Sequence, residues 1–360
     1  MQLLEGTLRA IRPRNEEARG RARARLEQLT MPYWALGRLM DLAEDLAGIT
    51  GNIQPPVARR SLVVMAGDHG VAAEGVSKYP PEVTVQMVLN FVRGGAGCNA
   101  MARVVGARVV VVDMGVAGAL PAEAAAAVLN RRVAAGTGNI ARGPAMTRAQ
   151  AVQALEAGIA IAADLDSTTD LFGTGEMGIA NTTASSAIVA TLCAAPPAEV
   201  TGAGTGIDEA QRRHKIAVVE RALAVNRPDP NDGLDVLARV GGFEIAGLAG
   251  LILGAAARRK PVLVDGFIST AAALIAQALA PDSVHSMIAA HRSEEPGHGA
   301  ALAKLGKRPL LDLGMRLGEG TGAALAMSLV EAAARLLTDV ATFEEAAVSQ
   351  ANRAAGHAVP

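Results

Sequence analysis

The chain has 360 residues, a formal net charge of −1 and a composition that is 50% hydrophobic but only 2% aromatic. A chain of this length can bury a sizeable core. The near-zero net charge excludes a global electrostatic field that would attract nucleic acid or an anionic membrane. With so few aromatic residues, the core must consist mainly of Ala, Val, Leu and Ile, as in a parallel sheet buried on both faces.

The first segment, residues 1–50, is predicted to be helical with a break at Pro32. Its arginine-rich part, 9–25, carries Ala and Leu at helical spacing and includes glutamates. We therefore interpret it as an exposed helix face rather than a nucleic-acid-binding arm or a transit peptide. The segment also lacks the apolar run of a signal peptide. The most apolar stretch, 245–257, is shorter than the roughly 20 residues that span a bilayer, so no membrane span is expected.

Six short apolar segments follow, and most lead through a glycine-rich or polar loop into a helical pattern. These predicted strands are 61–66, 108–113, a run that ends at Phe172, 261–265, 284–289 and 309–312. Residues 117–146 have no clear period and are left unassigned, and the tail 322–350 is predicted to form two helices. The pattern predicts an α/β fold with a mostly parallel six-stranded sheet flanked by helices. In such sheets ligands bind beyond the C-terminal ends of the strands, so these loops should converge on one crevice.

The stretch 170–183 is predicted to be a strand end, a glycine turn and a helix start. Glycines let a backbone approach a ligand closely, and the free N–H groups of a helix start favour a phosphate. The turn would contain Gly173, Gly175 and Gly178, and the helix would open with Asn181, Thr182 and Thr183. We therefore expect a mononucleotide-type phosphate site here. A turn without a ligand is the plainer alternative.

The same glycines also match the G-x-G-x-x-G dinucleotide fingerprint. That motif needs an acidic residue about 20 positions later, at the end of a second strand. Glu199 has the spacing, but no strand pattern precedes it. Glu176 moreover lies inside the turn, where a pyrophosphate would have to approach. We therefore disfavour a dinucleotide site.

Two further loops carry histidines. Asp68 and His69 follow the first predicted strand and could serve acid–base or metal chemistry, or could fix the turn by hydrogen bonds. The loop 291–298 has a histidine at each end and Glu294 and Glu295 between them. Its Pro and Gly break the helix that zinc motifs of this kind require, so we interpret it as a loop that covers a ligand, with Ser293 as a contact.

A lysine and a glutamate are the remaining candidates. Lys215 lies on the helix after a second glycine turn, 201–206, and could meet a phosphate or be solvated. Glu319 lies between Gly318 and Gly320, at the start of the helix after the last predicted strand. It could cap that helix. Partial burial in the crevice would instead raise its pKa toward that of a general base.

The two cysteines, Cys98 and Cys193, are far apart in sequence and fit no metal-binding spacing. We expect them to be buried thiols of a protein in a reducing compartment, the cytoplasm.

Several of these segments together resemble the nicotinate-nucleotide–dimethylbenzimidazole phosphoribosyltransferase family, which makes the lower-ligand nucleotide of cobalamin. The resemblance runs from about residue 60 to 325, while 1–55 carries no matching motif. It rests on the stretches 66–77, 82–91, 175–183, 241–250, 264–269, 290–298 and 310–323.

The resemblance implies a six-stranded parallel sheet, a smaller helical domain from both chain ends, a homodimer, and no cofactor or metal. The domains would be 56–322, and 1–55 together with 323–360. Glu319 would be the catalytic base. The nucleotide and its phosphate would contact Gly175, Glu176, Met177, Gly178, Ile179, Asn181, Thr182, Thr183, Gly204, Lys215 and Ser293. The benzimidazole pocket would include Ser77, Gln86, Met177 and Leu317.

The implied reaction transfers the phosphoribosyl group of nicotinate mononucleotide to 5,6-dimethylbenzimidazole, giving α-ribazole 5′-phosphate and nicotinate. Two other classes remain as alternatives: a nucleotide-binding or sensing protein without chemistry, and an NAD-dependent oxidoreductase. The sequence does not specify which base is preferred.

Overall fold

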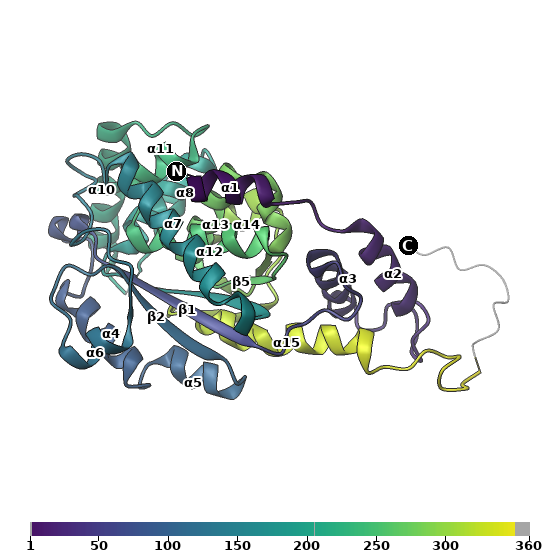
Figure 1. Ribbon diagram of the computed structural model, residues 1–360. Coiled ribbons are helices and arrows are strands. Elements are labelled where there is room, and N and C mark those ends of the chain that lie inside the picture. The colour runs from purple at the N-terminus through teal and green to yellow at the C-terminus, as the bar shows by residue number, and fades with distance from the viewer. Residues whose placement is uncertain (1, 205, 350–360) are drawn as a thin grey trace.

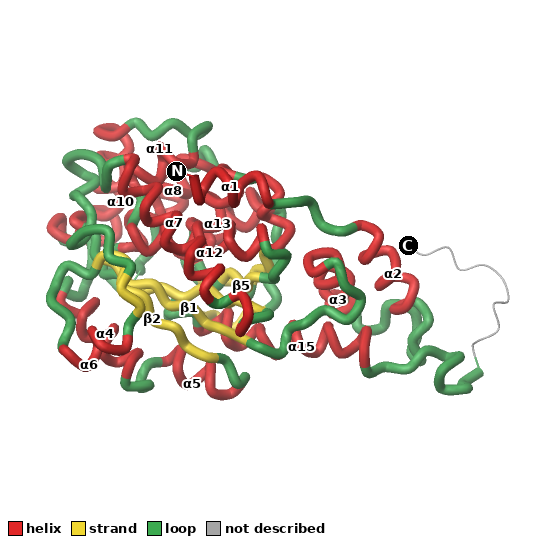
Figure 2. Tube along the Cα trace, in the orientation of Figure 1, coloured by secondary structure: helices red, strands yellow, loops and turns green. Residues whose placement is uncertain are grey.

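The computed structural model describes residues 2–204 and 206–349, and a parallel sheet lies at the centre of the fold (Figure 1). All strands of this sheet run parallel, in the order β3-β2-β1-β4-β5-β6, and helices cover both faces (Figure 2). The strands are β1 (Arg60–Gly67), β2 (Arg108–Gly115), β3 (Leu129–Asn130), β4 (Leu171–Met177), β5 (Val262–Val264) and β6 (Met287–Ala289). The predicted fold class is confirmed.

From β1 the chain adds β2 and β3 on one side of the sheet, and from β4 it adds β5 and β6 on the other side. β1 and β4 are therefore neighbours in the sheet although they are distant in sequence. This is the topological switch point of a doubly wound sheet, where the loops after the two strands diverge and leave a crevice. Val64 of β1 pairs with Val111 of β2 on one side and with Gly175 of β4 on the other.

Alternate side chains of β1 enter two separate cores, as the two-residue period of a strand requires. Val63 and Met65 belong to one core, and Leu62 and Val64 to the other. The helices of the first core are α1 (Gln2–Ala10), α7 (Arg148–Asp164), α8 (Asn181–Leu192), α9 (Pro197–Val200), α10 (Glu209–Asn226), α11 (Gly233–Val240), α12 (Phe243–Ala257), α13 (Phe267–Leu279) and α14 (Gly297–Leu305).

The second core contains the remaining helices: α2 (Glu16–Leu26), α3 (Arg38–Thr50), α4 (Glu82–Val92), α5 (Gly97–Val104), α6 (Ala122–Ala127) and α15 (Thr321–Thr338). Figure 1 shows α2, α3 and the end of α15 projecting from the body of the molecule. α1 instead packs on α7 and α12, on the opposite face of the sheet. The N-terminal segment thus divides between the two cores.

The strand predictions need correction at three places. The segment 309–312 belongs to β8 (Leu311–Met315), which pairs only with β7 (His291–Ser293) in a separate two-stranded sheet. The sixth strand of the main sheet is instead β3, a two-residue strand in the region left unassigned. The predicted strand 284–289 is extended only at β6, because its first part forms a 3-10 helix, Pro281–Ser286.

Two helix predictions also need correction. Residues 1–50 form three helices separated by non-helical segments at 11–15 and 27–37, so the break is wider than Pro32 alone. In the tail, α15 is followed by turns and an isolated bridge between Leu29 and Thr342, not by a second helix. The part of the predicted tail at 350, and residues 350–360 of the predicted helical domain, lie outside the described residues.

Among the residues that the structure describes, no helix is both long and apolar enough to cross a membrane.

Candidate active site

A pocket of about 670 Å³ opens at the C-terminal ends of β4 and β5, and the segment 76–87 forms part of its wall. This volume is within the range of small-molecule sites. The predicted site residues that line it are Ser77, Glu176, Met177, Gly178, Ile179, Asn181, Thr182, Gly204, Lys215, Ser293, Leu317 and Glu319. Gly175, Thr183 and Gln86 do not line it. Most of the loops that were expected to converge contribute to this pocket, but Asp68 and His69 do not line it.

The glycines before Glu176 do not form the predicted turn. Gly173 and Gly175 are inside β4, which continues to Met177 before the chain turns at Gly178 into α8. A Cβ on Gly175 would lie 2.5 Å from the backbone oxygen of Glu319, so a side chain is excluded there by packing. A turn was predicted because glycine is unusual within a strand. The close approach of another segment explains why β4 nevertheless contains glycine.

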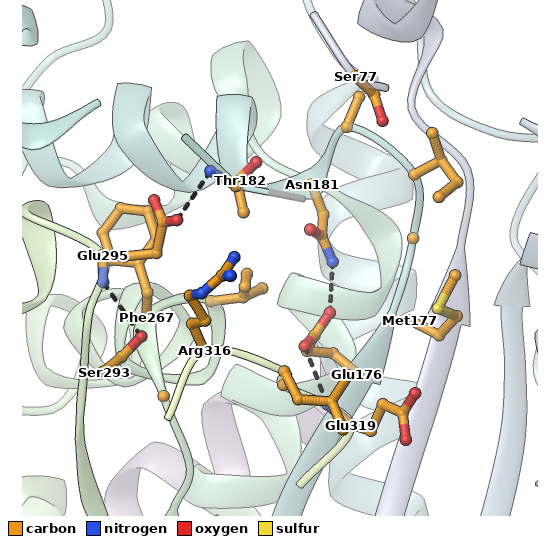
Figure 3. A pocket seen from close by; sticks show the side chains of 18 of the residues that line it. Ser77, Glu176, Met177, Asn181, Thr182, Phe267, Ser293, Glu295, Arg316 and Glu319 are labelled. Carbon is orange, nitrogen blue, oxygen red and sulfur yellow. Dashed lines mark hydrogen bonds between the residues drawn. The ribbon is translucent and has the colours of Figure 1, made fainter. Parts of the chain in front are cut away.

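Glu319 is in a strained conformation between two glycines. Gly318, Glu319 and Gly320 all have positive φ angles, of 81°, 60° and 88°. A positive φ is unfavourable for a residue with a side chain, and such strain is found where a structure fixes a functional group. The backbone N–H of Glu319 donates to Glu176 Oε1 at 3.3 Å, which holds the turn against β4 (Figure 3).

The carboxylate of Glu319 is buried and faces the N-terminus of α5. Its Oε2 accepts a hydrogen bond from the backbone N–H of Cys98 at 3.3 Å. Burial raises the pKa of Glu319, and nearby Asp265 acts in the same direction, whereas the N–H groups of Cys98 and Gly97 lower it. A buried carboxylate with a raised pKa that still has donors for its charged form is suited to accept a proton.

Glu176 is fully enclosed beside this turn. Its Oε2 accepts a hydrogen bond from Asn181 Nδ2, at the start of α8 (Figure 3). Burial, together with the charges of Asp265 and Glu244, raises the pKa of Glu176 to about 8. Glu176 therefore carries a proton at neutral pH, while the hydrogen bonds of its two oxygens tie Asn181 to the Glu319 turn.

Asp265 supports the same turn from the end of β5. Its Oδ1 accepts the N–H of Ala323 at 2.9 Å and its Oδ2 that of Gly320 at 3.3 Å. These are N–H groups of the first turn of α15, which have no partner within the helix. Asp265 thus caps α15 and fixes the position of Glu319.

A second group of side chains surrounds Lys215. The Nζ of Lys215 donates to Thr182 Oγ1 at 2.8 Å, and burial lowers the pKa of this lysine to about 8. Gly204 lies against this pair, because a Cβ there would be 3.1 Å from both Nζ and Oγ1. Its N–H donates to Glu295 Oε1 at 2.8 Å. A lysine, a hydroxyl and the N-terminus of α8 are the usual partners of a phosphate.

His298, at the end of the loop 291–298, is engaged by the protein itself. His298 Nδ1 accepts the N–H of Ser293 at 2.8 Å, and its Nε2 lies 3.0 Å from Thr270 Oγ1. Burial, followed by the proximity of His291 and Arg292, lowers the pKa of His298 to about 3, so this ring is neutral. His298 therefore fixes the loop that brings Ser293 and Glu295 to the pocket.

Asp68 and His69 are behind the pocket wall rather than in it. His69 Nε2 lies 2.6 Å from Glu244 Oε1, and both side chains are buried. Burial opposes the charge on His69, but Glu244 outweighs it and raises the pKa of the imidazole. Asp68 Oδ2 accepts the N–H of Ala117 at 2.7 Å. These contacts support the structural alternative, in which the two residues fix the turn after β1.

The remaining wall of the pocket is largely apolar. It comes from the segment after β1 and from α4, with Met177 and Leu317 on the facing side. Its residues are Val76, Ser77, Tyr79, Val83 and Met87. Gln86 is on the exposed side of α4, one residue before Met87. A flat, uncharged aromatic ring would fit such a wall.

Sequence reasoning missed three charged residues of the pocket as site residues: Asp265, Glu295 and Arg316. Asp265 could have been found, because it lies at the end of a predicted strand. Glu295 was considered only as a metal ligand, and Arg316 was within the quoted glycine-rich stretch without being singled out. Within the described residues, no group of three His, Cys, Asp or Glu side chains could hold a metal ion.

Comparison with known proteins identifies the family. The family model described as phosphoribosyltransferase matches residues 11–348. The nicotinate-nucleotide–dimethylbenzimidazole phosphoribosyltransferase of Syntrophotalea carbinolica is 66% identical over 351 residues, which are 97% of this chain and 99% of that protein. The protein of the same name from Roseiflexus sp. (strain RS-1) is 58% identical over 350 residues, again 97% and 99% of the two chains.

A solved structure agrees. The crystal structure of CobT from Thermus thermophilus superposes with a TM-score of 0.89 at 48% identity, covering 93% of this chain and all of that one. The resemblance seen in the sequence is thereby confirmed. The chain belongs to the phosphoribosyltransferase family whose curated members are named nicotinate-nucleotide–dimethylbenzimidazole phosphoribosyltransferase.

Proposed function

We propose that this protein transfers the phosphoribosyl group of nicotinate mononucleotide to 5,6-dimethylbenzimidazole, with Glu319 as the general base. It is an enzyme of the pentosyltransferase class, as its relatives are named. The observation that carries the assignment of the base is the Glu319 carboxylate, which is buried in a strained glycine turn at the pocket and has a raised pKa.

One carboxylate is sufficient for this reaction. The ring nitrogen of nicotinate mononucleotide is cationic, so when the bond from C1′ to that nitrogen breaks, nicotinate leaves without needing a proton. A nitrogen of the benzimidazole forms the new bond to C1′, and the N–H of the other nitrogen becomes acidic. Glu319 accepts that proton, and its charge stabilises the positive ribose before it does so. Attack on the face opposite to the leaving group gives the α-nucleotide.

The donor is held by its phosphate. Lys215, Thr182, Gly204 and Ser293 form the proposed phosphate site, to which α8 also points its N-terminus. A fixed phosphate positions C1′ relative to the base, so binding energy at a remote group serves the reaction. Glu176 and Asn181 lie between this site and Glu319 (Figure 3).

The acceptor would lie against the apolar wall, with Ser77, Met177 and Leu317 as contacts. Gln86, which faces away from the pocket lining, stays a proposal from the resemblance alone. We further propose a homodimer in the cytoplasm. Free thiols at Cys98 and Cys193 are consistent with a reducing compartment. The division into domains 56–322 and 1–55 with 323–360 stays a proposal from the resemblance, with the difference that α1 packs on α7 and α12 of the larger domain.

The test is incubation with nicotinate mononucleotide and dimethylbenzimidazole, followed by mass spectrometry for α-ribazole 5′-phosphate and free nicotinate. Both products are expected from the wild type. Glu319→Gln should bind both substrates and turn over at least about 100-fold more slowly, the usual effect of losing a general base. Binding without products from the wild type would instead indicate a sensing protein. A Glu319→Gln variant with normal kcat would remove Glu319 from the role of base.

A further inference from the structure

The pocket contains four carboxyl side chains: Glu176, Asp265, Glu295 and Glu319. The proposed donor brings two negative groups of its own, a phosphate and the carboxylate on the nicotinate ring. An aromatic carboxylate in such a pocket would be repelled unless a positive side chain met it. A basic side chain of the pocket lining is therefore expected to meet this carboxylate.

Among the described residues of the lining, the lysine and arginine side chains are those of Lys215 and Arg316. Lys215 is already committed, because it is buried and donates to Thr182 in the proposed phosphate site. Arg316 differs from Lys215 in its exposure and in its bonding. It is exposed, and within the described part of the chain it has neither a hydrogen bond nor an ion pair. Its guanidinium is therefore available for a ligand.

Figure 3 shows where Arg316 points: its side chain extends into the space between Glu295 and Thr182 on one side and Asn181 and Glu176 on the other. The residue is at the end of β8, three positions before Glu319 in the same loop. A planar guanidinium matches a carboxylate with two parallel hydrogen bonds, which a lysine cannot provide.

We propose that Arg316 binds the carboxylate of the nicotinate ring and so makes the enzyme select nicotinate mononucleotide over nicotinamide mononucleotide. The proposal rests on the proposed function, since it names how one substrate of that reaction is recognised. Arg316 would hold the leaving group on the opposite side of C1′ from the acceptor. Its charge would offset the repulsion between the ring carboxylate and the ionised carboxyl side chains of the pocket, to which the protonated Glu176 does not belong.

The experiment compares Arg316→Gln and Arg316→Lys with the wild type on both mononucleotides. The wild type should prefer the nicotinate compound. Arg316→Gln should lower kcat/KM for that compound by about 10- to 100-fold, the range for losing a hydrogen-bonded charged partner, and should leave kcat/KM for the amide within about 3-fold. Arg316→Lys should fall between, because it keeps the charge but loses the paired geometry.

Arg292 offers a matched control. It is an exposed arginine on β7, outside the pocket lining, with a distant ion pair to Asp312 at 3.9 Å. Arg292→Gln removes the same charge from the strand that pairs with β8 and should leave the preference unchanged. If both arginine variants behave alike, the effect is general electrostatics and the proposal fails.

Two other outcomes would overturn the proposal. Equal losses on both mononucleotides, absent with the phosphate-free ribosides, would place Arg316 at the phosphate. An Arg316→Gln enzyme with unchanged kinetics would remove it from substrate recognition. Calorimetric binding of free nicotinate and nicotinamide provides a readout that does not require turnover. The wild type should bind nicotinate more tightly, and Arg316→Gln should lose that difference, even if the proposed reaction itself does not occur.

Discussion

At the scale of single residues, the charge of Glu319 is maintained by a backbone group rather than by a basic side chain. Cys98 lies beside it, and a cysteine near the proposed catalytic carboxylate could itself take part in the chemistry. Burial, with the charge of Glu319 adding to it, raises the pKa of the Cys98 thiol to about 12, so the thiol is neutral and unreactive. It is the N–H of Cys98, free in the first turn of α5, that reaches the carboxylate.

Replacing Cys98 by proline removes this N–H, and proline is tolerated in the first turn of a helix. The bond favours the charged carboxylate, so its loss should raise the pKa of Glu319 further. The acidic limb of kcat/KM should then move up by about one to two pH units, since a bond to a charged group contributes roughly 1.5–3 kcal/mol. Activity at high pH, where Glu319 is ionised in both proteins, should change much less.

The control is Cys98→Ala, which removes the thiol and keeps the N–H. Its pH profile should match that of the wild type, and melting temperatures of both variants would establish that they fold. Equal shifts in the two variants would contradict the prediction, because the thiol or its packing would then be responsible.

At the scale of elements, β4 shows both the reach and the limit of sequence reasoning. Strands β1, β2 and β5 could be predicted, because their apolar runs are buried and flanked by polar loops. β4 was cut short at Phe172, since its glycines have no side chain that signals burial. The strand in 309–312 was misplaced because β8 is mostly exposed and pairs outside the main sheet. Neither the burial of the β4 glycines nor the pairing of β8 can be predicted without knowing which segments lie beside them.

The candidate site, too, could be predicted from the sequence only in part. Glu176, near the end of a strand of the main sheet, could be assigned to the pocket from the topology rule, whereas Glu319 was placed there from a strand that proved to lie outside that sheet. Arg316 could not be assigned to the pocket, because an arginine in a polar loop has the appearance of a solvated residue, and only the fold shows that it faces the pocket (Figure 3).

Gly175→Ala tests how β4 supports the turn that carries Glu319, the proposed base. The new Cβ would lie 2.5 Å from the backbone oxygen of Glu319, so that turn must move, and kcat should fall by at least about 10-fold because small displacements of a catalytic group are costly. Gly173→Ala is the matched control in the same strand. Its Cβ would meet side-chain atoms of Met327 at 2.9 Å and Leu62 at 3.0 Å, so it should lower the melting temperature with little effect on kcat. A similar kcat for the two variants would contradict this distinction.

At the scale of the whole molecule, the chain ends are distributed over both faces of the sheet. α1 crosses to the face of α7 and α12, whereas α2 and α3 pack with α15 on the other. Leu4 is 6% exposed within this contact, and its N–H donates to Glu156 Oε1 of α7 at 3.1 Å. The first helix thus belongs structurally to the body that carries the pocket, although it supplies no residue to the pocket lining.

Leu4→Ala should therefore destabilise the protein by about 2–4 kcal/mol, the range for truncating a buried leucine, and lower its melting temperature. Its kcat/KM at 25 °C should stay unchanged. Leu3→Ala is the control, because Leu3 is 44% exposed and its truncation should cost less than about 0.5 kcal/mol. If Leu4→Ala melted like the wild type, α1 would not be bound to this face in solution.

The origin of the pocket walls has a consequence for how such an enzyme can diversify. The apolar wall comes from one continuous piece of chain, 76–87, whereas the proposed phosphate contacts come from the segments around Thr182, Lys215 and Ser293. Substitutions in this one short stretch could therefore reshape most of the proposed acceptor wall without changing a proposed donor contact, and only Met177 and Leu317 of the proposed acceptor contacts lie outside it. Organisms that use different acceptor bases could exchange that stretch by recombination and keep the rest of the enzyme unchanged.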